Sequence, residues 1–157
     1  MKNTEGAFQW IIDILESHKI PYKISGGLAA RAHGSRRALA DIDIEVADAD
    51  VYKIAEYVKP YITFGPTHHK TETWEMELVV LEFEEQEIEI YGAEAKFFNP
   101  KTKLWERCSN LQNIEMKEVF GRIVPVESQE SLIAYKSKLA REVDLEDLRQ
   151  LGEAAAS

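Results

Sequence analysis

The stretch Asp41-Ile42-Asp43-Ile44-Glu45-Val46 alternates acidic and β-branched apolar residues, a pattern typical of a β-strand with one buried face. Side chains on a strand point alternately to its two faces, so the isoleucines and the valine are expected on the core side. The acids share the other face, where Asp41 and Asp43 lie about 7 Å apart along the strand. Such a pair can converge on one divalent cation, or on two that are ~3.5–4 Å apart. The strand alone is equally compatible with a solvated acidic face.

A glycine pair lies upstream of this strand. Gly26-Gly27 follows a short strand predicted at residues 22–25 and opens an alanine-rich helix predicted at residues 28–33. Glycine lets the backbone approach a ligand closely, and the N–H groups at a helix N-terminus bind phosphate oxygens. A plain tight turn explains a lone glycine pair equally well. Together with the Asp-x-Asp strand, however, the pair predicts a phosphate site that faces a metal site.

These motifs resemble a known family. Ser25-Gly26-Gly27, thirteen further residues and then Asp41-Ile42-Asp43 resemble the signature of the DNA-polymerase-β-type nucleotidyltransferase superfamily. The turn that ends in Arg36-Arg37 is similar to the small bacterial and archaeal branch, which includes antibiotic nucleotidyltransferases and the nucleotidyltransferase toxins of abortive-infection systems. Arg37 fills the branch's arginine position, whereas Leu39 stands where the branch has threonine. Near the C-terminus, residues 125–136 with Arg141, Asp144 and Asp147 are similar to its closing segment.

The resemblance implies a Mg²⁺-dependent transfer of a nucleoside monophosphate from a nucleoside triphosphate, ATP in the first place, to an acceptor hydroxyl, with release of pyrophosphate. It implies that Asp41 and Asp43 hold one or two Mg²⁺ ions. It also implies a third metal-binding and catalytic acid on a neighbouring strand. Glu89 fits this role best, and Glu87 is the alternative on the same face. The run of six glutamates in residues 82–94 also fits a solvated face.

The predicted nucleotide-binding residues are Ser25, Gly26, Gly27, Arg37 and Lys136. Lys136 lies within the apolar stripe of a predicted helix, so it needs an anionic partner unless it extends to solvent. Bound phosphates or the carboxylate cluster would supply that partner. Arg37 either clamps phosphate or is an exposed loop arginine. Asp144 and Asp147 are expected to cap the last helix.

The order of predicted elements indicates an α+β fold, a twisted mixed sheet flanked by helices. Helices are expected at residues 4–18, 28–33, 48–58, 128–141 and 145–154. Strands are expected at residues 22–25, 41–46, 61–64, 74–83, 87–91, 114–119 and 123–126, with a loop at residues 65–73. We expect a single nucleotidyltransferase-like domain over residues 1–157, with residues 128–157 as its C-terminal helical part.

The composition limits the classes of binding partner and the location that we expect for the protein. The net charge of −9 disfavours binding of duplex nucleic acid. The single cysteine excludes an intrachain disulfide, and no signal peptide or membrane span is recognised, so a cytoplasmic protein is expected. Relatives use small molecules, protein side chains or tRNA as acceptors. A tRNA acceptor would require Arg31, Arg36 and Arg37 to share a basic face with residues 96–107.

Two functions are alternatives to the nucleotidyltransferase. The first is a catalytically inactive nucleotide-binding module, which the residues Leu39 and Glu89 suggest. The second is a toxin–antitoxin partner protein that acts by binding alone.

Overall fold

The computed structural model describes residues 1–108 and 110–156, with side chains as far as residue 152. Its helices are α1 (Thr4–Ser17), α2 (Gly26–Ala32), α3 (Asp48–Tyr57), a 3-10 turn η1 (Lys59–Tyr61), α4 (Gln129–Leu139) and α5 (Glu142–Ala156). Its strands are β1 (Tyr22–Ser25), β2 (Asp41–Val46), β3 (Ile62–Lys70), β4 (Trp74–Phe83), β5 (Gln86–Gly92), β6 (Lys96–Asn99), β7 (Leu104–Arg107), β8 (Ile114–Val119) and β9 (Arg122–Glu127).

The strands form one mixed sheet. Its order is β7-β6-β4-β5-β2-β1-β9-β8, and β3 pairs with β4. Strand β2 runs parallel to β5, β1 runs parallel to β9, and the remaining pairs are antiparallel. The predicted α+β class with a mixed sheet is therefore confirmed. The parallel β2–β5 pair matters most for function, because it sets Asp41 opposite Glu87 and Asp43 opposite Glu89.

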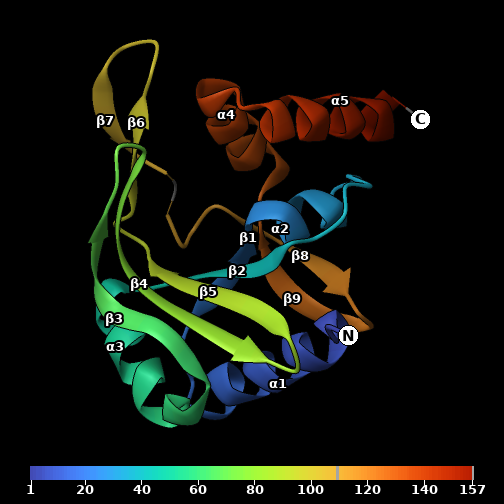
Figure 1. Ribbon diagram of the computed structural model, residues 1–157. Coiled ribbons are helices and arrows are strands. Elements are labelled where there is room, and N and C mark those ends of the chain that lie inside the picture. The colour runs from blue at the N-terminus through green and yellow to red at the C-terminus, as the bar shows by residue number, and fades with distance from the viewer. Residues whose placement is uncertain (109, 157) are drawn as a thin grey trace.

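The core lies between the sheet and helices α1 and α3, which Figure 1 shows together below the sheet. The apolar stripe of α1 is fully buried there, as are the isoleucines of β2, Ile42 and Ile44. Burying such side chains is worth about 1.5–3 kcal/mol each. This burial orients β2, and the strand's alternation then turns Asp41 and Asp43 to the opposite face.

Two parts of the strand prediction were wrong. Residues 65–70, expected in a loop, belong to β3, where the segment from Thr67 to Lys70 pairs with β4. The Gly65-Pro66 pair, which favoured a loop, lies at a shift in the β3–β4 register, so the ladder resumes beyond it. The hairpin of β6 and β7 was not predicted, because its strands have only four residues each.

The C-terminal helices lie on the side of the sheet opposite α1, beyond α2 (Figure 1). Ser128 caps α4, and its Oγ accepts a hydrogen bond from the Ser131 N–H. Helix α5 begins at Glu142, three residues before the predicted start.

Among the described residues, no helix is both long and apolar enough to cross a membrane.

Candidate active site

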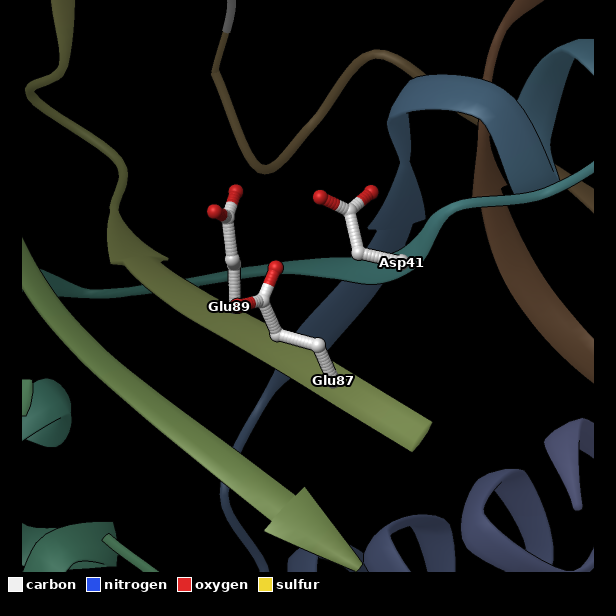
Figure 2. Close-up of side chains that lie close together, drawn as sticks. All are labelled: Asp41, Glu87 and Glu89. Carbon is white, nitrogen blue, oxygen red and sulfur yellow. The ribbon is translucent and has the colours of Figure 1, made fainter. Parts of the chain in front are cut away.

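Carboxylates from two neighbouring strands meet on one face of the sheet. Asp41 of β2 and Glu87 and Glu89 of β5 each offer an oxygen, and these oxygens lie within 4.8 Å of one another. Figure 2 shows the three side chains projecting to the same side of their strands. Asp43 is the register partner of Glu89. Hard divalent cations prefer oxygen ligands, and these oxygens are close enough to bind one ion together.

The electrostatics of this acidic cluster oppose full ionisation. The pKa of Asp43 lies well above its usual value, first because the carboxyl is desolvated and then because Asp41 and Glu89 are negatively charged nearby. Desolvation also raises the pKa of Glu89; a hydrogen bond with Asp43 opposes that shift, and the charges of Asp41 and Glu87 add to it. A bound cation would remove this repulsion.

We therefore expect Mg²⁺ binding to tighten as pH rises. The raised pKa of Asp43 means that a proton is retained above the ordinary pKa of aspartate, and the metal must displace it. Calorimetric titrations with Mg²⁺ and a non-hydrolysable ATP analogue, repeated in buffers of different ionisation enthalpy, should show proton release that diminishes as pH increases. Affinity that does not change with pH, together with no proton release, would contradict this expectation.

The glycine turn packs directly against the acidic cluster. Gly26 has a left-handed backbone, with φ +59°, and a Cβ built on it would lie 2.0 Å from Asp43 Oδ2. A Cβ on Gly27 would lie 3.3 Å from Arg37 Nη2. Ser25, which precedes the pair, is buried, and its Oγ receives a 2.7 Å hydrogen bond from the Tyr91 hydroxyl. The predicted phosphate turn and the predicted metal ligands are thus in contact.

Substitution of Gly26 by alanine tests this contact. Gly26→Ala is expected to destabilise the protein by about 1–2 kcal/mol through its left-handed backbone and to reduce activity strongly by displacing Asp43. Gly121→Ala is the matched control, because Gly121 also has positive φ (+78°) but a Cβ there meets nothing within 4 Å. Thermal melts and turnover assays of both variants should show at least as much destabilisation at Gly26 as at Gly121, but loss of activity only at Gly26. Equal activity in the two variants would refute the steric argument.

A cavity of about 360 Å³ lies above these residues. It brings together every residue that the sequence assigns to the site: Ser25, Gly26, Gly27, Arg37, Asp41, Asp43, Glu89 and Lys136. Glu87 is absent from the described residues that line the cavity, and its side chain is more exposed than that of Glu89. This difference favours Glu89 as the third acid.

The cavity walls include residues that the sequence did not assign to a site. Tyr91, Tyr135 and Arg141 line the cavity, as does Trp74. The Trp74 ring lies 5.9 Å from that of Tyr135 and 5.5 Å from the Arg141 guanidinium. Tyr91 carried a signal in the strand pattern, because it follows Glu89 by two residues on the same strand face. Tyr135 and Arg141 lie in the C-terminal segment that resembles the family.

Lys136 has partners other than those expected. It is 3% exposed, and its Nζ lies 3.3 Å from Asp144 Oδ1 and 3.0 Å from Asp147 Oδ2. The expected helix-capping role is wrong for Asp147, which lies in the second turn of α5 and binds side chains of other elements. Asp144 is not the N-cap either; it lies inside the first turn and accepts the Arg141 backbone N–H at 3.0 Å.

The fold is that of known nucleotidyltransferases. A protein from Thermotoga maritima with a provisional nucleotidyltransferase assignment is 24% identical, with TM-score 0.75 over 95% of this chain and 93% of its own. The lincosamide antibiotic adenylyltransferase LnuA, solved with lincomycin, is 20% identical, with TM-score 0.66 over 98% and 99%. ANT(2'')-Ia in complex with adenylyl-2''-tobramycin is 15% identical, with TM-score 0.64 over 96% and 88%. No curated protein sequence matches the chain.

Fold and sequence together define the class of protein, a nucleotidyltransferase. A sequence model of the aminoglycoside-2''-adenylyltransferase family matches residues 8–151, and the chain belongs to this family. The predicted resemblance to the antibiotic nucleotidyltransferase branch is thereby confirmed. The association with toxin–antitoxin systems and the cytoplasmic location remain predictions.

Proposed function

We propose that the protein transfers the AMP group of ATP to a hydroxyl group of a small-molecule acceptor, with Mg²⁺ held by Asp41, Asp43 and Glu89. One observation carries the proposal: the acids and the Gly26-Gly27 turn line one cavity, and Gly26 packs against Asp43. Phosphate-binding N–H groups and metal-binding carboxylates are thus next to each other, as a metal–nucleotide complex requires.

The side chains present fit a divalent metal. Asp41, Glu87 and Glu89 offer oxygens within 4.8 Å of one another, and the pKa of Asp43 is raised, first by desolvation and then by the negative charges of Asp41 and Glu89. Mg²⁺ bound to Asp41, Asp43 and Glu89 would neutralise phosphate charge and favour departure of pyrophosphate. Glu87 is absent from the described lining of the cavity, but its oxygen lies close enough to those of Asp41 and Glu89 to make it the alternative third ligand.

The protein's own groups define the rest of the reaction. The Gly26-Gly27 turn would hold the β- and γ-phosphates through backbone N–H groups, while Arg37 and Lys136 offset their charge. The acceptor oxygen attacks the α-phosphorus, a new P–O bond forms, and the bond to pyrophosphate breaks. Glu89 accepts the proton of the acceptor hydroxyl, because it lines the cavity beside the acids that would hold the metal. Positioning and electrostatics supply most of the catalysis.

A small-molecule acceptor is favoured over tRNA for two reasons. The family is that of an aminoglycoside adenylyltransferase, and two of the neighbours, LnuA and ANT(2'')-Ia, were solved with lincomycin and with adenylyl-2''-tobramycin. The basic groups that tRNA would need are also far apart. Figure 1 places the β6–β7 hairpin and the turn after α2, which carries Arg36 and Arg37, on opposite sides of the molecule. In the hairpin, Arg107 pairs with Glu94, and Glu106 pairs with Lys138 of α4.

The proposal is tested by incubating the protein with Mg²⁺, ATP and a panel of aminoglycosides and lincosamides, and measuring pyrophosphate release together with the mass of the acceptor. An acceptor that carries AMP, formed only with Mg²⁺, is the expected result. Binding of ATP without pyrophosphate release for any small molecule, protein or tRNA would instead establish an inactive nucleotide-binding module. A biological effect that survives in a folded Asp41→Ala/Asp43→Ala variant would establish a partner that acts by binding alone.

A further inference from the structure

Charged side chains of α4, α5 and the turn after α2 form a row of alternating sign behind the cavity. Its order is Arg37, Asp147, Lys136, Asp144 and Arg141. Each neighbouring pair is in contact, with nitrogen–oxygen distances between 2.7 and 3.3 Å. All three cations line the cavity, whereas both aspartates are fully buried and are absent from the described lining. The row therefore carries one net positive charge and turns only its positive members to the ligand.

Asp147 joins the two cations that face the phosphate side of the cavity. Its two carboxylate oxygens accept hydrogen bonds from Arg37 Nε at 3.1 Å and Nη2 at 3.0 Å, and Oδ2 also lies 3.0 Å from Lys136 Nζ. The Ser35 hydroxyl donates to Oδ1 at 2.8 Å. Burial alone would raise the pKa of Asp147, but hydrogen bonds from Arg37, Lys136 and Ser35 outweigh it and leave the pKa below its usual value. The carboxylate is thus anionic at neutral pH.

These contacts fix the direction of both cations. Arginine and lysine have long, flexible side chains, and fixing them before a ligand arrives lowers the entropy lost on binding. The bidentate pair with Asp147 engages Nε and Nη2 of the Arg37 guanidinium and leaves its Nη1 side for a ligand, while Nη2 also lies next to Gly27. Lys136 is 3% exposed and is held between two buried aspartates.

We propose that Asp147 is a positioning residue for nucleotide binding, which holds Arg37 and Lys136 at the triphosphate from behind. The inference rests on the proposed function, since it takes the triphosphate as the ligand of these cations. It assigns to the C-terminal helix α5 a part in the active site, although Asp147 itself touches no substrate. Loss of its charge should weaken binding of the triphosphate more than it slows the turnover of bound substrate.

A loss of nucleotide affinity in an Asp147 variant has two explanations. Either Asp147 positions Arg37 and Lys136, or it only attaches α5 to the turn after α2. Gln150, one turn further along α5, provides the matched control. Its side chain contacts the same turn, through Ser35 Oγ at 3.3 Å and the Arg36 backbone N–H, but it reaches neither Arg37 nor Lys136 through any described contact. Gln150→Leu therefore weakens the attachment of α5 and leaves the charged row intact. Asp147→Asn keeps the shape of α5 and removes the charge.

The test is a calorimetric titration of the full chain with a non-hydrolysable ATP analogue and, separately, inorganic triphosphate, both with Mg²⁺. Asp147→Asn is expected to weaken both affinities by about tenfold, as orienting partners do for metal ligands, and to raise KM for ATP more than it lowers kcat. Gln150→Leu should lower the melting temperature without this loss of affinity. In an Arg37→Gln background, Asp147→Asn should have a smaller effect than in the wild type.

Three results would overturn the inference. The first is an unchanged affinity in Asp147→Asn while the wild type binds the analogue, which leaves the proposed function standing. The second is an equal affinity loss in Gln150→Leu, which would mean that α5 docking alone is responsible. The third is a wild type that binds neither probe, which would remove the proposed function and the inference together.

Discussion

Asn in place of Asp43 is expected to reduce nucleotidyl transfer by on the order of 10²–10³-fold or more, because the site loses an anionic oxygen that stabilises charge at the reacting phosphates. The same change should stabilise the metal-free protein by about 0.5–2 kcal/mol, since it removes a desolvated carboxyl group that lies beside the negative charges of Asp41 and Glu89. A variant that is more stable and less active than the wild type is a strong sign of a residue retained for function.

The stability effect has a defined pH dependence. The pKa of Asp43 is raised in the folded state, so above the ordinary pKa of aspartate the unfolded chain binds fewer protons than the folded chain. Stability of the metal-free wild type therefore falls as pH rises towards the folded pKa, whereas the Asp43→Asn variant lacks this contribution. Thermal melts without metal from pH 4 to 8 should show the two proteins diverging as pH rises.

Asp13→Asn is the control for this substitution. Asp13 lies on the surface of α1 and pairs with Arg122 at 2.8 Å. Its replacement should leave activity unchanged and should not stabilise the protein. Activity of Asp43→Asn within a factor of about ten of the wild type, well inside the loss expected for a charge-stabilising group, would show that Asp43 is not part of the metal site.

Methionine in place of Lys136 is expected to have the second large effect. The change removes the cation between two buried aspartates, each of which keeps one arginine partner. A loss of about 3 kcal/mol in the free energy of unfolding follows, or roughly 6–12 °C in melting temperature. Nucleotide affinity should also fall by about 10–100-fold, because a charge-assisted hydrogen bond to phosphate is lost.

Lys138→Met is the matched control on the same helix. Lys138 pairs with Glu106 at 2.9 Å, but its side chain is 48% exposed. Exposed pairs contribute about 0–1 kcal/mol, so this variant should melt close to the wild type and bind nucleotide normally. Denaturant unfolding and calorimetry on both variants make the comparison. If Lys136→Met is no more affected than Lys138→Met, the buried charged row has no role in stability or binding.

Local patterns in the sequence predicted which side chains lie together at the cavity. Alternation along β2 and β5 is a two-residue period, and it correctly turned Asp41, Asp43 and Glu89 to the same side. The positive φ that Gly26 adopts explains why glycine was informative there. The roles assigned to these residues remain to be tested.

Contacts between residues far apart in the chain could not be predicted from the sequence. Glu45 was expected to share the open face with Asp43, but it is fully buried, because the β1–β2 register sets it opposite Lys23. Their charged atoms lie 3.5 Å apart. The partners of Lys136 were missed for a related reason. They lie on the next helix, whose true start at Glu142 moves Asp147 out of the capping region and towards Arg37.

The central claim is that Asp41, Asp43 and Glu89 hold the metal at the nucleotide phosphates. The most direct test is an anomalous difference map from crystals grown with Mn²⁺ and a non-hydrolysable ATP analogue. We predict a peak within bonding distance of these three carboxylates and of the analogue's phosphates, with the β- and γ-phosphates at Gly26-Gly27. Phosphates bound in the cavity with no metal between them and these acids, or a metal held elsewhere, would contradict the claim.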